Sequence, residues 1–193
     1  AGILERHNRD QFETFGYSVH GNKKSEMRQR IIKSFDNFED VEDLNDTAIA
    51  HKARQDGIDI AIDLGGHTLH NRLGALAYRA APIQINYLVY PGTSGTNFLD
   101  YIVADPVLIP TSMKKHYSEQ IIYLPNTYQP TDNKRTISNK IITRKNAGLP
   151  DHAFVFCCFN QNFKISSTEF GIWMRLLSKV EGSVLWLMES NKR

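Results

Sequence analysis

The feature that most constrains the fold is a strand-like run over residues 58–64 that ends in two glycines. Isoleucine or leucine alternates there with aspartate or alanine, giving the text Ile58-Asp59-Ile60-Ala61-Ile62-Asp63-Leu64. Alternation with a period of two is typical of a β-strand. The turn Gly65-Gly66-His67-Thr68 follows at once, and residues 71–79 then carry helical spacing. A strand, a turn and a helix in that order form the unit from which parallel α/β sheets are built.

The same order of elements recurs along the chain. Further strands are predicted at residues 15–19, 83–89, 101–104, 120–124, 153–159 and 183–188. Helices or helical turns are predicted at residues 1–7, 27–35, 47–55, 71–79, 112–117 and 167–181, with a turn at 21–24. Repeated strand–helix–strand units favour a mostly parallel sheet with helices on both faces. Ligand-binding loops of such sheets lie at the carboxyl ends of the strands, where residues 65–68 and 90–96 fall.

Two of the predicted helices have clear boundary signals. Ser25 is a candidate N-cap, and Gly57 lies where the helix over residues 47–55 stops. Ser166-Ser167-Thr168-Glu169 fits a capping box, in which the first serine caps the helix and the glutamate lies three residues later.

The chain divides into three predicted segments. Residues 1–130 form one α/β unit, residues 131–150 a linker, and residues 151–193 open a second unit. Residues 131–146 carry five lysines or arginines against one aspartate, which indicates either a solvated connector or a patch that attracts phosphate. Residues 153–159 are a continuous apolar run, which is typical of a strand buried on both faces.

Bulk composition excludes some partners. The net charge of +2 is too small to indicate binding to nucleic acid or a membrane surface. No apolar run approaches the roughly 20 residues that a membrane span needs. Cys157 and Cys158 are sequence neighbours whose side chains point to opposite faces of a strand, so they are not expected to form a disulfide. Their state favours a reducing compartment and a cytoplasmic location.

The loop over residues 160–165 is the first candidate site. It lies between an apolar strand and a capped helix, whose free N–H groups and positive dipole end attract phosphate. Lys164 adds a full positive charge, and Gln161 adds a donor and an acceptor. Such a loop would stabilise a diphosphate leaving group, although a loop lysine is more often simply solvated. The loop lacks the glycine pattern of a Walker phosphate loop.

Two more loops are candidates. His67 follows paired glycines and could contact a ligand, or belong to a plain turn. Asp63, His67 and His70 also leave open a metal site, although no further ligand cluster lies near them in the sequence. Residues 90–96 combine two glycines with three hydroxyl groups, which indicates a sugar or peptide pocket or an ordinary tight loop.

Taken together, these segments resemble the catalytic region of the O-GlcNAc transferase and SPINDLY family. The matching text, in order, is Asp56-Gly57-Ile58, Asp63-Leu64-Gly65-Gly66-His67-Thr68, Ala81-Pro82-Ile83-Gln84, Tyr90-Pro91-Gly92-Thr93-Ser94-Gly95, Asp100-Tyr101-Ile102, Tyr117-Ser118-Glu119, Leu124-Pro125, Phe159-Asn160-Gln161-Asn162-Phe163-Lys164-Ile165 and Ser183-Val184-Leu185-Trp186-Leu187. Each motif alone is weak, but their shared order covers nearly the whole chain.

The resemblance implies a two-lobed GT-B fold with Rossmann-type parallel sheets. Residues 1–130 would be most of the acceptor-side lobe, and residues 151–193 would open the nucleotide-sugar lobe. The implied reaction is inverting transfer of N-acetylglucosamine from UDP-GlcNAc to Ser or Thr hydroxyls of proteins, with no cofactor and no required metal. Gln161 and Lys164 would contact the donor diphosphate, with Lys164 acting as the catalytic group. The implied cleft wall near sugar and acceptor is His67, Thr68, Leu88, Tyr90, Pro91, Gly92 and Thr93.

The chain also departs from the family pattern. A histidine proposed as the base would lie before Ala1, further donor loops after Arg193, and the usual tetratricopeptide repeats are absent, so the chain alone is expected to be an inactive fragment. Val89 stands where relatives often have glycine. Three alternatives stay open: a non-catalytic or degenerate module, a parent enzyme using glucose or fucose donors, and a metal-dependent hydrolase.

Overall fold

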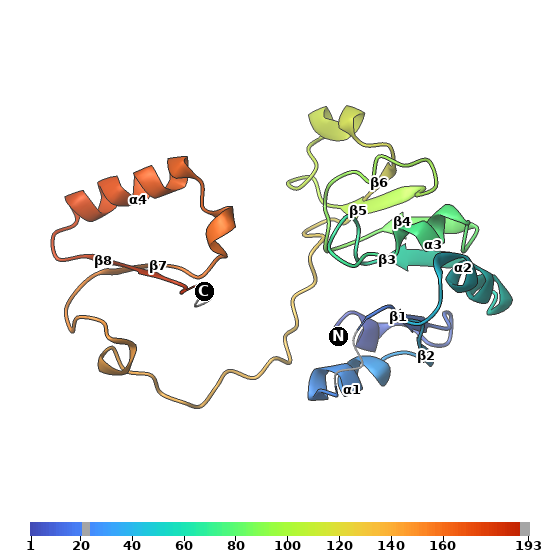
Figure 1. Ribbon diagram of the computed structural model, residues 1–193, viewed down its shortest axis with the longest axis horizontal. Coiled ribbons are helices and arrows are strands. Elements are labelled where there is room, and N and C mark those ends of the chain that lie inside the picture. The colour runs from blue at the N-terminus through green and yellow to red at the C-terminus, as the bar shows by residue number, and fades with distance from the viewer. Residues whose placement is uncertain (21–23, 190–193) are drawn as a thin grey trace. The chain divides into compact units, whose positions relative to one another are not determined.

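The computed structural model describes residues 1–20 and 24–189, which form two compact units, Ala1–Arg135 and Thr136–Arg193 (Figure 1). The predicted division at residues 130 and 150 is not tested by this and stays a prediction. The turn predicted at residues 21–24 falls almost entirely outside the described residues.

The first unit contains two parallel sheets. Strand β1 (Phe15–Ser18) pairs with β2 (Asn37–Asp40). The larger sheet has four parallel strands in sequence order, namely β3 (Ile60–Asp63), β4 (Ile83–Asn86), β5 (Tyr101–Ala104) and β6 (Gln120–Tyr123). The predicted α/β class with parallel strands is therefore confirmed. Strand β2 is absent from the prediction because Phe38 is its one apolar residue, so it shows no alternation.

Helices α1 (Glu26–Ile32), α2 (Asp46–Gln55) and α3 (Leu73–Ala77) connect these strands, with 3-10 turns η1 (Leu4–Arg6) and η2 (Thr111–His116). The Ser25 hydroxyl accepts from the Arg28 backbone N–H, which confirms Ser25 as the cap of α1. Gly57 follows α2 with a φ of 71°, a left-handed conformation that glycine adopts without strain.

The core lies on one face of the four-stranded sheet. Ala50 and Ala53 of α2 and Leu76 of α3 pack with Ala61 of β3, and Ile102 of β5 forms a second cluster on the same face. On the opposite face of this sheet, two isoleucines of β3 are exposed, Ile60 by 46 % and Ile62 by 52 %. The connections after β3, β4 and β5 contribute their buried residues to the core face of the four-stranded sheet. The expectation of helices on both faces stays a prediction.

Polar side chains hold the strand ends within this core. The Gln84 side chain is fully buried in β4, and its amide nitrogen donates to the carbonyls of Leu76 and Phe98 at 2.9 and 2.7 Å. Its amide oxygen accepts from the Ala80 N–H at 2.8 Å. A buried amide with all these bonds satisfied ties α3 and the segment before β5 to β4.

The second unit consists of strands β7 (Val155–Cys158) and β8 (Val184–Leu187), paired in parallel, and helix α4 (Ser167–Lys179). Short turns η3 (Lys145–Ala147) and η4 (Asn162–Lys164) complete it. The Ser166 hydroxyl accepts from the Glu169 N–H, so the predicted cap is confirmed. Among the described residues, no helix is long and apolar enough to cross a membrane.

The prediction that residues 153–159 are buried on both faces is wrong. No described side chain of the second unit reaches the buried class, and Phe154 and Phe159 are 60 % and 54 % exposed. The physical reason is coverage: one helix packs on one face of a two-stranded sheet and leaves the other face open. An apolar strand is buried only where other elements pack against both of its faces. Its composition does not show that those elements belong to the same unit.

Candidate functional site

The candidate loop over residues 65–68 begins at the carboxyl end of β3. The Asp63 carboxylate accepts hydrogen bonds from the backbone N–H groups of Gly65 and Gly66, at 3.3 and 2.6 Å. The Thr68 hydroxyl donates to the Gly65 carbonyl at 2.8 Å, so Thr68 closes its own turn. These local bonds hold the loop tightly and present His67 as an exposed side chain.

His67 joins this loop to the next one. Its Nε2 lies 2.8 Å from the Ser94 carbonyl oxygen, and its ring meets the Tyr90 ring edge-on, with centroids 5.4 Å apart and planes at 89°. Gly66 has a φ of 54°, and a side chain there would overlap with Tyr90. The structure therefore brings His67, Tyr90 and Ser94 together at the carboxyl ends of β3 and β4, as strand order requires.

Residues outside the predicted set anchor the loop over residues 90–96. The Glu119 carboxylate accepts from the Thr93 hydroxyl and the Ser94 N–H, both at 2.7 Å. The Tyr117 hydroxyl donates to the Pro91 carbonyl at 3.1 Å. The sequence analysis noted Tyr117-Ser118-Glu119 only as matching text, because nothing in its spacing relates it to a loop about 25 residues earlier.

A second anchor is Asn86, the last residue of β4. Its amide nitrogen lies 3.3 Å from the Tyr90 carbonyl and 3.4 Å from that of Gly92, and its side chain is fully buried. The Asn86 amide oxygen has no hydrogen-bond partner among the residues that the structure describes. Gly92 stands close to the Tyr90 ring, where an added side chain would meet ring atoms at 2.9 Å.

The backbone before this loop is strained at Leu88. Leu88 has a φ of 85°, in the left-handed region that non-glycine residues rarely adopt. Val89 is not among the described residues with positive φ, so its position needs no unusual backbone. The half-buried Leu88 takes the unusual conformation instead, and strain of this kind is concentrated at functional sites.

The candidate loop over residues 160–165 lies between β7 and α4. Gln161 precedes η4 and Lys164 ends it, and the Lys164 N–H donates to the Gln161 carbonyl at 2.9 Å. Both side chains are exposed, and the Lys164 ammonium makes no hydrogen bond or ion pair with any described residue. A hollow of about 420 Å³ lies at the same strand ends. Its lining residues are Asn160, Asn162, Ile165, Ser166, Ser167, Phe170, Leu187 and Met188.

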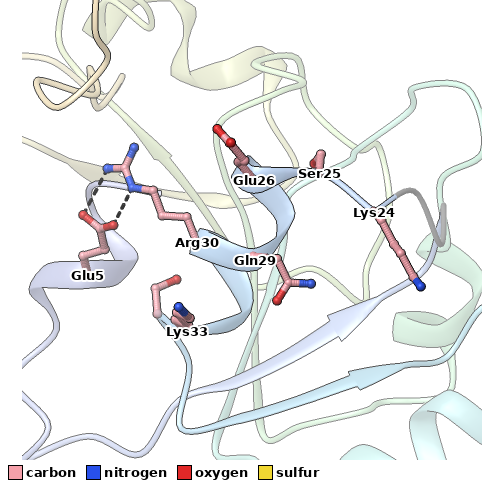
Figure 2. Close-up of a pocket in the computed structure, with 8 residues that line it drawn as sticks. Glu5, Lys24, Ser25, Glu26, Gln29, Arg30 and Lys33 are labelled. Atoms are coloured by element: carbon pink, nitrogen blue, oxygen red, sulfur yellow. Dashed lines mark hydrogen bonds and ion pairs between the residues drawn. The ribbon is translucent and has the colours of Figure 1, made fainter.

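A larger hollow, of about 730 Å³, lies along α1 and contains none of the predicted site residues. Figure 2 shows Arg30 reaching from α1 to Glu5 of the N-terminal turn. Arg30 also pairs with Asp132 at 2.7 Å, and Lys134 pairs with Glu5 at 2.9 Å. These ion pairs hold residues 132–134 of the predicted linker against the first unit, so the hollow is an open surface over a structural ion-pair network.

The structure does not bring Asp63, His67 and His70 together as metal ligands. Asp63 accepts from two backbone N–H groups, His67 contacts Ser94, and the His70 carbonyl contacts the ring of His20. Within residues 1–20 and 24–189, no group of three or more His, Cys, Asp or Glu side chains is placed to hold a metal ion. Nothing in the geometry favours the metal-dependent hydrolase.

Comparison with known proteins decides the family. The family model of glycosyl transferase family 41 matches residues 1–141 and 131–192, nearly the whole chain. The chain belongs to glycosyl transferase family 41.

Several relatives are similar to this chain over most of its length. A probable UDP-N-acetylglucosamine–peptide N-acetylglucosaminyltransferase SEC of Arabidopsis thaliana is 37 % identical over 96 % of this chain, which covers 20 % of that protein. The enzyme of Caenorhabditis elegans is 34 % identical over 72 % of this chain and 12 % of its own length. A SPINDLY protein of Eustoma exaltatum is 30 % identical over 93 % of this chain. The chain thus spans about a fifth of the Arabidopsis relative.

A solved structure of the family agrees with the fold. A lysine-to-methionine mutant of the Thermobaculum terrenum O-GlcNAc transferase superposes with a TM-score of 0.81 at 29 % sequence identity, covering 96 % of this chain and 34 % of that one. This likeness confirms the predicted α/β fold with parallel sheets and the predicted family. The roles of Gln161, Lys164 and the cleft-wall residues are separate questions and stay proposals.

Proposed function

We propose that this chain is part of the catalytic region of a protein O-GlcNAc transferase, which transfers N-acetylglucosamine from UDP-GlcNAc to Ser or Thr hydroxyls of proteins. The observation that carries the proposal is 37 % identity over 191 residues to an Arabidopsis protein named for this activity. The chain covers 20 % of that relative, so the proposed activity belongs to the full-length protein. The two free cysteines favour a reducing, cytoplasmic location for it.

In the proposed reaction, the oxygen of an acceptor hydroxyl attacks the anomeric carbon of the sugar. The bond from that carbon to the diphosphate oxygen breaks, UDP leaves with the bonding electrons, and the hydroxyl proton passes to a base. Negative charge grows on the diphosphate as the bond breaks. A positive group placed there before the reaction lowers the barrier, since it stabilises the transition state more than the bound substrate.

Lys164 is the group we propose for that task. It lies between β7 and the start of α4, where an unpaired ammonium and the positive end of a 13-residue helix act together. The Glu169 carboxylate contacts Ser166 in the first turn of α4 and offsets part of the helix-end charge. Lys164 therefore supplies most of the positive charge that a diphosphate meets, and Gln161 at the other end of η4 adds a polar contact.

The test is the kinetics of the full-length protein with Lys164 replaced. Lys164→Ala should lower kcat for UDP-GlcNAc transfer by about 100-fold or more, with a smaller change in donor KM. Lys164→Arg should rescue only in part, because a planar guanidinium places its donors differently. Lys179→Ala, at the exposed far end of α4, is the matched control. Near-normal kcat in a folded Lys164→Ala protein would remove Lys164 from the mechanism.

A further inference from the structure

Glu119 is a buried carboxylate that accepts hydrogen bonds from the loop over residues 90–96. It lies directly before β6 and is 5 % exposed, yet none of the ion pairs formed by the described residues includes it. Its partners are the Thr93 and Ser118 hydroxyls, at 2.7 and 3.1 Å, and the Ser94 backbone N–H at 2.7 Å. A buried carboxylate without a cation is costly unless such donors are held in place, so this arrangement is narrowly defined.

The charge state of Glu119 fits these partners. Burial by itself raises the pKa of the Glu119 carboxyl, but hydrogen bonds from Ser94 and Thr93 outweigh it and leave the pKa below its ordinary value. Glu119 is therefore an acceptor at neutral pH, and both of its oxygens accept from the segment over residues 93–94 or from Ser118. The Thr93–Ser94 peptide is held from one side.

The following peptide, Ser94–Gly95, contacts His67 through the Ser94 carbonyl. The Ser94 residue is 7 % exposed, its N–H donates to Glu119, and its carbonyl lies 2.8 Å from His67 Nε2. A carbonyl oxygen only accepts, so Nε2 must carry the hydrogen in this contact. In neutral His67 the remaining nitrogen, Nδ1, then has a lone pair, and it forms no hydrogen bond with any described residue. The Tyr90 ring limits rotation of the imidazole.

We propose that Glu119 is a positioning residue, which fixes Thr93 and the backbone of Ser94 and so keeps His67 in its Nε2–H tautomer with Nδ1 ready to accept a hydrogen bond from a hydroxyl group. This inference rests on the proposed function, because the hydroxyl belongs either to the sugar of the nucleotide donor or to the Ser or Thr acceptor. Glu119 acts through Ser94 and His67 and does not touch the substrate itself.

The first test reads the tautomer and needs no activity. The full-length protein is labelled with ¹⁵N-histidine and measured above the ordinary histidine pKa, and the His67 signal is identified by its loss in His67→Ala. Wild type should show a protonated Nε2 and an unprotonated Nδ1. Glu119→Gln should give a mixture of tautomers, because the amide keeps one acceptor oxygen and its nitrogen cannot accept, so either Thr93 or Ser94 loses its acceptor. Glu42→Gln is the matched control and should leave the signal unchanged, because the exposed Glu42 carboxylate has no hydrogen bond or ion pair with any described residue.

Two results overturn the inference: a protonated Nδ1 in the wild type, or a wild-type tautomer in folded Glu119→Gln. If Glu119→Gln fails to fold, Thr93→Val replaces it, since this change removes the hydroxyl that lies 2.7 Å from Glu119 and leaves the carboxylate in place. Thr93→Val should also give mixed tautomers, and an unchanged signal counts against the proposal.

The second test is a double-mutant cycle in the transferase assay. Glu119→Gln should lower kcat by about tenfold or more alone, but by less than about twofold in the His67→Ala background, because the two residues act in series. Additive losses would overturn the proposed route through His67. In His67→Ala, a raised donor KM identifies the sugar as the source of the hydroxyl, and a raised acceptor KM identifies the peptide. Wild-type protein with the expected tautomer and no transferase activity would overturn the proposed function and leave the loop geometry intact.

Discussion

Gly66 shows how one residue shapes the candidate site. Its φ of 54° lies in the left-handed region, and its Cα faces the Tyr90 side chain at the junction of the two first-unit loops. The positive φ is strained for any residue with a side chain, and the Tyr90 side chain occupies the space that a Cβ would need. Gly57 shares only the first condition, since its φ is 71° and nothing lies within 4 Å of where a Cβ would be.

We therefore predict that Gly66→Ala destabilises the protein more than Gly57→Ala. Gly57→Ala should cost about 1–2 kcal/mol, the price of a left-handed conformation for alanine. Gly66→Ala should cost about 1–3 kcal/mol more, because Tyr90 must move to make room. Urea unfolding of the two variants measures the difference. Equal costs would show that Tyr90 does not lie against Gly66.

Which residues meet in the site was only partly predictable. Residues 65–68 and 90–96 were predicted to be ligand loops because both follow strands, and the structure places both at the carboxyl ends of β3 and β4. The contact from His67 to Ser94 joins residues 27 positions apart and depends on the neighbouring order of β3 and β4, which alternation alone does not give. Glu119 and Asn86 have no local signal, because their roles arise from packing.

At the scale of elements, the helix caps were predicted well, because they depend on residues that are close in the sequence. Ser25 and Ser166 cap their helices because a hydroxyl satisfies a free N–H three residues later, a relation that is visible in the sequence. Burial was predicted poorly, because it depends on what covers a strand. The isoleucine face of β3 is exposed, and the smaller Ala61 faces the helices instead.

The predicted linker begins as part of the first unit. Arg30 of α1 lies between Glu5 and Asp132, with donor–acceptor distances of 2.6 and 2.7 Å. Hydrogen bonds from Arg30 and then Lys134 lower the pKa of Glu5 from 4.5 to about 2, and Arg30 likewise lowers the pKa of Asp132 from 3.8 to about 2. Both carboxylates are thus better ionised in the folded state than in the unfolded chain.

The sign of the pH effect follows from these pKa values. A lowered folded-state pKa gives stability that is present above the unfolded value and is lost as pH falls toward the folded value. Arg30→Gln should therefore lower the melting temperature at pH above about 5. The difference in melting temperature between Arg30→Gln and wild type should vanish near pH 2. Arg6→Gln, an exposed arginine of η1 without a partner among the described residues, is the control. A difference that does not depend on pH would contradict the ion-pair account.

At the scale of the whole molecule, the two units differ in how well they are buried. The first unit has clusters of buried side chains on one face of its four-stranded sheet, whereas no described side chain of the second unit is buried. Stability tracks buried apolar surface, so the second unit should open far more readily.

Hydrogen exchange of the 193-residue chain tests this difference. Amides of β4 and β5 should exchange slowly, and those of β7, β8 and α4 should exchange close to the rate of an unfolded peptide. The exposed isoleucines of β3 and aromatic residues of the second unit should also make the isolated chain prone to association. Equal protection in both units, with a monomeric and cooperatively melting chain, would contradict this account.

The most direct test of the central claim is a transfer assay of the full-length protein with a panel of nucleotide sugars. UDP-GlcNAc, UDP-glucose and GDP-fucose are offered separately with peptides that carry Ser or Thr, and sugar on the peptide is measured by mass spectrometry. The account predicts transfer of N-acetylglucosamine in preference to the other two sugars. Transfer from only one of the other donors would contradict the proposed substrate. Folded protein that transfers none of the three would contradict the proposed activity.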